Sequence, residues 1–392
     1  MNTLRITARA EKRLKSGHLW IFSNEFDNQF KSLKDIENGE QVAVENEKGK
    51  VVAYAIINPQ ALICGRIVSR KRPFARNELK KVLRDALALR EDVYDKPFYR
   101  LFYAEGDYLP GLIIDRYGDC CVVQINNLGL EAYRDDIAEL LISITGGNTV
   151  LIRNDGGKRE QNGLLETENV EYGDVPDSIQ IEENGCLFDI PIKDGQKTGW
   201  FYDHRDNRDK IAKLSKDKTV LDVFSYIGGW GVQCLHAGAS KLTAVDASEF
   251  ALEQLHKNAA LIGRENDVET LMGNAFDALE ALLEEKQKFD VVIIDPPAFI
   301  KKKKDFNRGA QAYKKINELA LRLVNHNGLF VSASCSMHMA DSDLQDIVQK
   351  AARHVDRNVS LIHRGGHAID HPIHPAIKES EYLKAQIYKL RG

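Results

Sequence analysis

The segment Phe289-Asp-Val-Val-Ile-Ile-Asp-Pro-Pro-Ala-Phe299 decides the fold of the C-terminal half of this 392-residue chain. Its apolar run is typical of a buried strand in a parallel sheet, and Asp295 stands where that run ends. A second apolar run, 328–333, leads into Ser334-Cys-Ser336. Because open α/β folds bind ligands at the carboxyl ends of their strands, we expect Asp295 and Cys335 to lie at one edge of a sheet.

Strand and helix patterns alternate regularly around these two segments. The expected strands, each with the helix that follows it, are 219–224 with 229–237, 241–245 with 248–261, 290–294 with 308–324, and 328–333 with 341–352. Two late apolar segments, 359–363 and 383–390, are expected to form a closing β-hairpin. This alternation predicts an α/β, Rossmann-like domain with a mainly parallel sheet, which we bound at 179–392.

The preceding residues are expected to form two further domains. Residues 1–74 contain short strand-like runs over 41–44, 51–57 and 61–67, the spacing of a small β-barrel. Residues 75–178 begin with an amphipathic helix that Asn77 is expected to cap. Strand patterns and a second helix follow it, so we predict a central α+β domain.

Charge is distributed unevenly along the chain. Residues 1–74 contain 13 Lys and Arg against 8 Asp and Glu, whereas the whole chain has a net charge of −4. A basic module joined to an acidic body is typical of proteins in which one module binds phosphates. The candidate RNA-binding residues are Arg9, Lys12, Arg13 and Lys15 in this module, and Lys301, Lys302, Lys303, Lys304 and Arg308 after the Asp-Pro-Pro segment.

The six cysteines are scattered, and none forms a Cys-x-x-Cys pair, so we expect no metal site. Free cysteines in a chain long enough to bury its own core are typical of a reducing, cytoplasmic location. No run of about 18 apolar residues indicates a membrane span, and the first residues do not resemble a signal peptide.

A candidate cofactor site follows the first strand of the C-terminal domain, in Leu221-Asp-Val-Phe-Ser-Tyr-Ile-Gly-Gly-Trp-Gly231. Gly228 and Gly229 allow a ligand to approach the backbone closely, but the spacing is not that of a dinucleotide-binding turn. Asp246, at the end of the next strand, is placed to bind ribose hydroxyls, and Asn274 follows the third strand, where it can contact adenine. Nucleoside recognition without a phosphate cradle predicts S-adenosylmethionine as the cofactor.

These residues resemble the class I methyltransferases. More narrowly, they are similar to bacterial large-subunit ribosomal RNA 5-methylcytosine methyltransferases that carry an N-terminal PUA domain. The resemblance rests on Asp222-Val-Phe-Ser-Tyr-Ile-Gly-Gly229, Asp246-Ala-Ser248, Asp295-Pro-Pro-Ala-Phe299 and Ser334-Cys-Ser336, and on the segments 13–25, 104–118 and 196–205. The family usually has Gln where His204 stands, and here Ala298 occupies a position where many RNA 5-methylcytosine enzymes have a second cysteine.

The resemblance implies ribosomal RNA as the partner, suggests a homodimer, and adds Thr198, Gly199, Phe201 and Arg205 to the cofactor pocket. With these four, the expected cofactor-binding residues are Asp222, Phe224, Ser225, Tyr226, Gly228, Asp246, Ala247, Ser248, Asn274, Ala275, Phe276 and Asp295.

The predicted chemistry is methylation of cytosine at carbon 5. This carbon is a poor nucleophile until a thiolate adds at carbon 6, so we expect Cys335 to act as the nucleophile and Asp295 to hold the base. The base must leave its stack to be reached. Two alternatives remain open: methylation of a nucleobase nitrogen, which needs no cysteine, and a non-catalytic RNA-binding assembly factor that has kept the fold.

Overall fold

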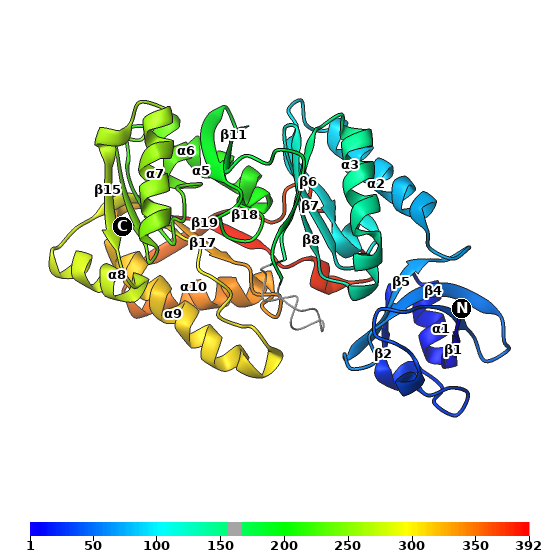
Figure 1. The fold of residues 1–392 in the computed structure, drawn as a ribbon. Coiled ribbons are helices and arrows are strands. Elements are labelled where there is room, and N and C mark those ends of the chain that lie inside the picture. The colour runs from blue at the N-terminus through cyan, green and yellow to red at the C-terminus, as the bar shows by residue number, and fades with distance from the viewer. Residues whose placement is uncertain (155–166, 392) are drawn as a thin grey trace. The chain divides into compact units, whose positions relative to one another are not determined.

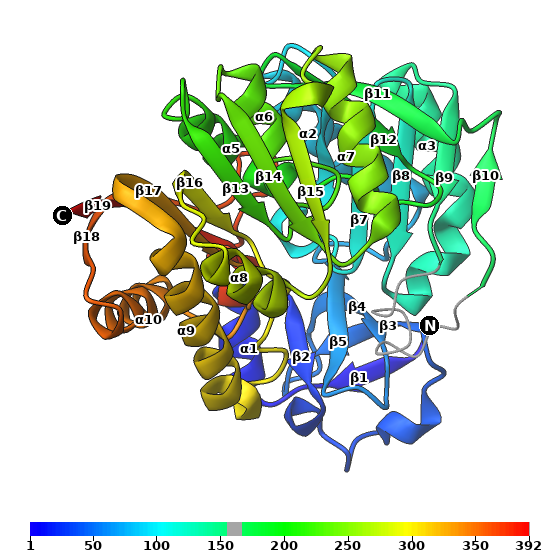
Figure 2. The same cartoon turned by 90° about the vertical axis from the view of Figure 1, so that its left-hand side faces the viewer.

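The computed structural model describes residues 1–154 and 167–391. The chain divides into two compact units. The first contains residues 1–179, 190–202 and 369–380, and the second contains residues 180–189, 203–368 and 381–392. Figures 1 and 2 show the helices and strands of both units.

The first unit begins with a five-stranded sheet in the order β1-β3-β4-β5-β2. Its elements are β1 (Thr3–Arg5), α1 (Ala8–Lys15), β2 (Trp20–Phe22), β3 (Gln41–Glu45), β4 (Val51–Ile57) and β5 (Ile63–Ser69). Strands β3, β4 and β5 confirm the three predicted strands. Strands β1 and β2 were missed because each has only three residues, too few to show an alternating pattern.

A second five-stranded sheet follows, in the order β10-β9-β8-β7-β6. The elements are α2 (Arg76–Glu91), β6 (Phe98–Tyr103), β7 (Leu112–Tyr117), β8 (Cys120–Ile125), α3 (Arg134–Thr145), β9 (Thr149–Ile152) and β10 (Val170–Tyr172). Apolar side chains of α2 and α3 pack with this sheet in one core. The predicted cap at Asn77 is wrong: the N-cap of α2 is Ala75, which makes no side-chain capping bond, and Asn77 lies inside the first turn.

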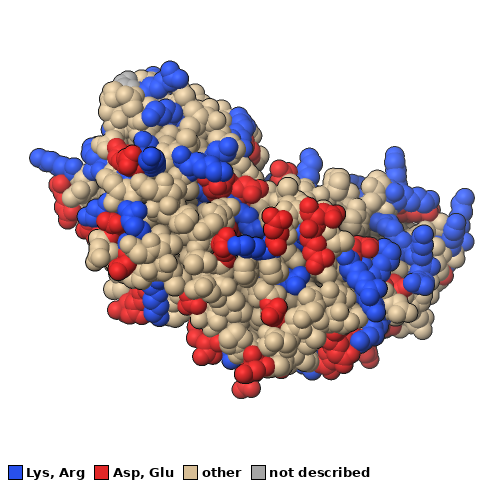
Figure 3. All heavy atoms as spheres, turned by 90° about the horizontal axis from the view of Figure 1, so that it is seen from above, with Lys and Arg blue, Asp and Glu red and all other residues tan. Residues whose placement is uncertain are grey.

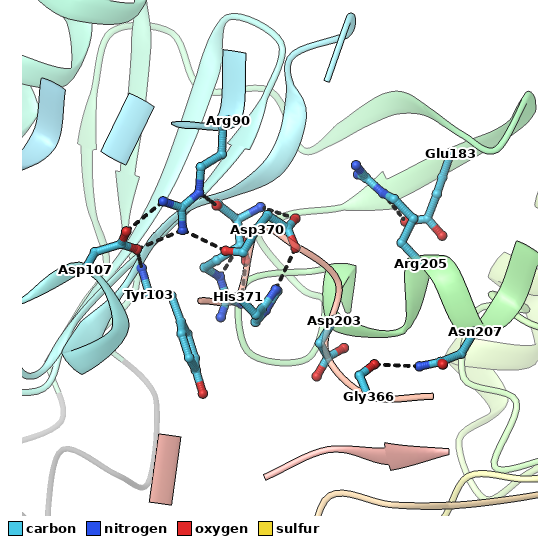
Figure 4. Close-up of polar contacts among 12 residues, drawn as sticks. Arg90, Tyr103, Asp107, Glu183, Asp203, Arg205, Asn207, Gly366, Asp370 and His371 are labelled. Atoms are coloured by element: carbon cyan, nitrogen blue, oxygen red, sulfur yellow. Dashed lines mark hydrogen bonds and ion pairs between the residues drawn. The ribbon is translucent and has the colours of Figure 1, made fainter. Parts of the chain in front are cut away.

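A buried ion pair attaches the late segment 369–380 to this central sheet (Figure 4). Arg90 is fully buried, and its two terminal nitrogens donate to the carboxylate of Asp107 at 2.7 and 2.8 Å. One of the same nitrogens donates to the carbonyl oxygen of Asp370 at 2.7 Å, and the carboxylate of Asp370 accepts from His371 Nδ1 at 2.8 Å. Residues far apart in the sequence therefore share one core.

The second unit is built around a seven-stranded sheet in the order β15-β14-β13-β16-β17-β19-β18. Its strands are β13 (Thr219–Val223), β14 (Lys241–Asp246), β15 (Val268–Met272), β16 (Phe289–Ile294), β17 (Val324–Ser334), β18 (Asn358–Gly365) and β19 (Lys384–Arg391). The first five are parallel, and β19 runs antiparallel between β17 and β18. The predicted alternation and the closing hairpin are confirmed. A hairpin of β11 (Ser178–Glu183) and β12 (Cys186–Pro191), which the sequence analysis did not identify, precedes the sheet.

Helices cover both faces of this sheet (Figures 1 and 2). They are α5 (Arg205–Ala212), α6 (Gly231–His236) and α7 (Glu249–Leu261) in one layer, and α8 (Ala275–Glu284), α9 (Phe306–Leu323) and α10 (Asp341–His354) in the other. Alternate residues of the strands, such as Leu221 and Val223, pack against buried residues of α9 and α10 in one core. The polar residues that end the strands remain at the carboxyl edge of the sheet.

Candidate active site

The ends of three adjacent parallel strands bring the predicted residues together. Val223, at the end of β13, pairs with Ile294, at the end of β16, and Ile294 pairs with Ser332 of β17. Asp295 directly follows β16, and Cys335 directly follows β17. The sequence therefore places both predicted reactive side chains at the same edge because their strands are neighbours in one parallel sheet.

The turn between β13 and α6 has an unusual backbone. Phe224 and Tyr226 adopt φ values of +66° and +48°, a backbone region that residues other than glycine seldom adopt. Gly228 has a φ of +91°. A Cβ at Gly228 would lie 2.6 Å from a methyl carbon of Val232. Non-glycine residues in this region cost of order 1–3 kcal/mol each and are concentrated at functional sites. The backbone conformation of the predicted glycine turn is therefore tightly constrained by the residues around it.

Asp246 joins this turn to the next strand end. One carboxylate oxygen accepts from the backbone N–H of Tyr226 at 2.8 Å, and the other accepts from that of Ser248 at 2.9 Å. Ser248 in turn caps α7 by accepting from Ala251 N. Asn274 caps α8 in the same way, by accepting from Phe276 N at 2.9 Å. These predicted residues therefore fix the strand-to-helix turns around the candidate cofactor site.

Asp222 is completely buried on β13, and one of its oxygens accepts from Gly231 N at 2.9 Å. Burial raises the pKa of Asp222 to about 7, with Asp295 and Asp246 adding to the increase. Its other oxygen and the hydroxyl of Ser225 are buried without a hydrogen-bond partner among the described residues. Buried polar atoms of this kind are normally satisfied, so the turn has the unfilled hydrogen-bonding capacity that a polar ligand such as an adenosyl group would take up.

Four other predicted cofactor residues precede the seven-stranded sheet in the sequence. Thr198, Gly199 and Phe201 belong to the first unit, where the carbonyl oxygen of Thr198 accepts from the hydroxyl of Tyr117 at 2.9 Å. Arg205 begins α5 in the second unit, and Figure 4 shows its side chain directed at Glu183, with Nε 3.5 Å from the carboxylate. The role of these four residues at the cofactor remains a prediction.

Two residues that the sequence analysis did not assign to the site hold Asp295. The indole N–H of Trp230 donates to one carboxylate oxygen at 3.0 Å, and His204 Nε2 lies 3.4 Å from the other. Burial alone would raise the pKa of Asp295, but His204 and Trp230 together hold it below its usual value. Asp295 is therefore an ionised hydrogen-bond acceptor. Trp230 stands within the quoted glycine-turn segment, and His204 is the departure from the family pattern, so both had a signal in the sequence.

Cys335 differs from every other cysteine of the chain. It is half-buried, whereas the other five are buried. Burial raises the pKa of all five, and to about 12 for Cys64, Cys121, Cys186 and Cys234. The Sγ atom of Cys335 lies 3.9 Å from the carbonyl oxygen of Pro296, in the Asp-Pro-Pro segment. Cys335 is thus the one thiol with access to solvent, and it lies against the predicted base-holding loop.

The serines that flank Cys335 are fixed by a buried tyrosine of α9. Ser334 donates to the hydroxyl of Tyr313 at 2.9 Å, and the hydroxyls of Ser336 and Tyr313 are 3.0 Å apart. Ser336 also accepts from Ile300 N at 3.2 Å. This network attaches the cysteine turn to the loop that follows Asp295, and so fixes the position of the thiol.

The predicted basic run lies next to this loop. Lys301, Lys302, Lys303, Lys304 and Arg308 are all exposed. The lysines make no ion pair among the described residues, and Arg308 lies 3.9 Å from Asp305. An open hollow of about 530 Å³ is lined by Pro297, Phe299, Lys301 and Arg308, among others. Aromatic and cationic side chains around one hollow are typical of sites for single-stranded nucleic acid.

The basic residues of the N-terminal module divide into two groups. Arg9, Lys12 and Lys15 are exposed. Arg13 is partly buried and pairs with Glu25, with its guanidinium 4.6 Å from the centre of the Phe22 ring. Lys15, although exposed, pairs with Glu11 at 2.7 Å. Figure 3 shows Lys and Arg side chains spread over the face drawn, with Asp and Glu side chains among them. The exposed cations are therefore the better candidates for phosphate contacts.

Two family models match the chain. A PUA-like domain matches residues 4–70, and an S-adenosylmethionine-dependent methyltransferase matches residues 166–388, more than half of the chain. The chain belongs to the S-adenosylmethionine-dependent methyltransferases. The predicted fold class and the predicted cofactor are thereby confirmed.

Curated relatives agree with this assignment, and a solved structure shares the fold. The ribosomal RNA large subunit methyltransferase I of Vibrio vulnificus (strain CMCP6) is 37% identical over 384 residues, which cover 95% of this chain and 96% of the relative. The protein of the same name from Aliivibrio fischeri (strain MJ11) is 36% identical over 388 residues, with the same coverage. This chain belongs to the same family as these relatives. A solved methyltransferase structure complexed with SAH has the same fold, with a TM-score of 0.83 and 22% identity over 99% of this chain and 100% of that chain.

Two further findings concern the described residues, 1–154 and 167–391. No helix there has both the length and the apolar character that crossing a bilayer requires. Nor does any group of three or more His, Cys, Asp or Glu side chains lie close enough together to hold a metal ion.

Proposed function

We propose that this methyltransferase modifies carbon 5 of a cytosine in large-subunit ribosomal RNA through a covalent bond to Cys335. The observation that carries the proposal is the position of Cys335, the one solvent-accessible thiol of the chain, against the Asp-Pro-Pro loop of Asp295. The names of the relatives support ribosomal RNA as the substrate. The PUA-like domain and the exposed basic residues support contacts with RNA.

The ionised state of Asp295 supports cytosine rather than uracil. The exocyclic amine of cytosine donates hydrogen bonds, and an ionised carboxylate only accepts them. Uracil has a carbonyl oxygen at the same position, which an ionised Asp295 would repel. His204 and Trp230, which keep the pKa of Asp295 low, therefore act as positioning residues for base selection.

The chemistry assigned to Cys335 proceeds in three steps. The thiolate adds to carbon 6, and the electron pair of the 5,6 double bond moves to carbon 5, which becomes nucleophilic. Carbon 5 then takes up the electrophilic methyl group that bound S-adenosylmethionine would supply, and S-adenosylhomocysteine would be the leaving group. A base then removes the proton from carbon 5, the double bond re-forms, and the bond from carbon 6 to sulfur breaks to return the thiolate.

The test uses RNA that contains 5-fluorocytosine, because fluorine cannot leave in place of the proton. Wild-type protein should form an adduct with this RNA that survives denaturation, and peptide mapping should place the link at Cys335. Cys335→Ala and Cys335→Ser should both lose the adduct and the methyl transfer while keeping their affinity for the cofactor. Cys120→Ala, which removes a buried cysteine of the first unit, is the matched control.

Full methyl transfer by Cys335→Ala, together with no adduct in the wild type, would exclude the carbon-5 mechanism. Methylation of a nucleobase nitrogen would then be the better account, and analysis of the modified nucleoside by mass spectrometry would identify it. Absence of any methyl transfer to ribosomal RNA by a protein that binds S-adenosylmethionine would favour a non-catalytic RNA-binding factor.

A further inference from the structure

A buried lysine lies beside the proposed nucleophile. Lys384 is the first residue of β19, and its backbone pairs with Ser334 in the antiparallel register between β17 and β19. Its Nζ donates to the carbonyl oxygen of Ser336 at 2.7 Å and to that of Tyr382 at 2.8 Å. Lys384 is therefore tied to both sequence neighbours of Cys335, and only 5% of it is exposed.

This ammonium group has no carboxylate in contact with it among the described residues. Asp341, on the adjacent helix α10, is engaged by Arg364 and by Gln386, whose Nε2 lies 2.7 Å from the carboxylate. Asp343 accepts from Ala340 N at 2.9 Å. A buried positive charge is costly unless an anion compensates it, so the environment of Lys384 favours an anion nearby.

Four titratable groups have the largest influence on the pKa of Lys384. They are Cys335 after β17, Glu381 before β19, and Asp341 and Asp343 on α10. Burial lowers the pKa of Lys384 to about 8, and the strongest opposing influence is Cys335, ahead of the three acids. Lys384 therefore remains mostly protonated at neutral pH, and the group with which its charge interacts most favourably is the thiol of Cys335.

We propose that Lys384 holds Cys335 in the thiolate form that attack on carbon 6 requires. The inference rests on the proposed function, because only that chemistry uses a thiolate. Sulfur loses its negative charge when it bonds to carbon 6 and regains it when that bond breaks. The ammonium of Lys384 keeps its proton throughout, so it stabilises the attacking and the departing thiolate alike. Lys384 is a positioning residue that acts through Cys335.

The first experiment measures how fast iodoacetamide alkylates Cys335 as a function of pH, with neither RNA nor cofactor present. Peptide mass spectrometry separates Cys335 from the five buried cysteines. The wild-type rate should reach half its maximum below pH ~8.5, the ordinary pKa of a cysteine thiol. A midpoint at or above that of the same chain unfolded in urea would overturn the proposal without any variant being needed.

Two variants test whether the charge of Lys384 is what lowers the midpoint of the alkylation rate. Lys384→Met keeps the length of the side chain and removes the charge, so its midpoint should rise by about one pH unit or more and its rate at pH 7 should fall about tenfold. Lys384→Arg keeps the charge and should retain most of the wild-type rate. Equal midpoints for Lys384→Met and wild type, in proteins with the same thermal unfolding temperature, would contradict the proposal.

These outcomes can be separated from failure of the proposed function. A trapped 5-fluorocytosine adduct, combined with an alkylation midpoint that does not depend on Lys384, would overturn the role of the lysine alone. A midpoint that depends on Lys384, combined with no adduct, would leave an activated thiol in place and refute the carbon-5 mechanism alone.

Discussion

Replacing Trp230 with Phe tests whether the site holds Asp295 as a charged acceptor. The substitution keeps an aromatic ring and removes the indole N–H that donates to Asp295 at 3.0 Å. A hydrogen bond to a charged group contributes about 1.5–3 kcal/mol when its partner remains buried. The side chain of Asp295 is 21% exposed, so we expect the lower part of that range.

This free energy has two measurable consequences. One pKa unit corresponds to about 1.4 kcal/mol, so the pKa of Asp295 should rise by about one unit in Trp230→Phe. The native pKa is held below the ordinary value, so the hydrogen bond stabilises the fold above about pH 4. The stabilisation is lost as the pH falls through the native pKa and the carboxylate becomes protonated.

A double-mutant cycle separates the hydrogen bond from the smaller volume of Phe. The free energy of urea unfolding is measured for wild type, Trp230→Phe, Asp295→Asn and the double variant, at pH 7 and again below pH 4. We expect a coupling energy of about 1.5–2 kcal/mol at pH 7 that decreases at the lower pH. If Trp230→Phe costs the same free energy with Asp295 and with Asn at that position, the argument that Trp230 stabilises the charge is refuted.

Three further predictions address the cofactor, the RNA and the pH dependence of stability. Asp246→Ala should weaken binding of S-adenosylmethionine by about 1–3 kcal/mol, and calorimetry that finds an unchanged affinity would remove Asp246 from the cofactor site. Changing the exposed Arg9, Lys12 and Lys15 to Gln should weaken RNA binding and flatten its dependence on salt, whereas an identical salt slope would exclude phosphate contacts at these positions. Because burial raises the pKa of Asp222 to about 7, the unfolded chain releases a proton between about pH 4 and pH 7 that the folded chain retains. Wild-type stability should therefore fall over this interval relative to Asp222→Asn, and a constant difference in unfolding free energy would contradict the raised pKa.

The sequence predicted the strand ends well because the parallel strands are almost wholly apolar and end abruptly in polar residues. Asp295 and Cys335 could be placed at one edge since each follows such a strand. The glycine turn could be located for the same reason. The sequence pattern did not predict the positive φ values of Phe224 and Tyr226. Residues of these types disfavour such values, and the surrounding structure imposes them.

The contacts made by Asp295 and near Cys335 could not be predicted for a different reason, although Trp230 itself lies in the glycine-turn segment. Trp230 contacts Asp295 across 65 residues of sequence, and Lys384 contacts Ser336 across 48. The periodicity of apolar residues in the sequence indicates neither contact, because each contact depends on which strands are neighbours in the sheet. The antiparallel insertion of β19 between β17 and β18 is decided by tertiary packing, so no local pattern could show that a lysine would lie beside Cys335.

The position of β19 has a consequence for biosynthesis. Strand β17 is translated before the strand that pairs with it on one side, residues 384–391, which follows about fifty residues later. Until those residues leave the ribosome, the backbone groups of β17 on that side form an unpaired edge, which can aggregate or pair wrongly. Lys384 arrives with the same strand. Cys335, the proposed nucleophile, therefore gains its full surroundings only when β19 has joined the nascent sheet.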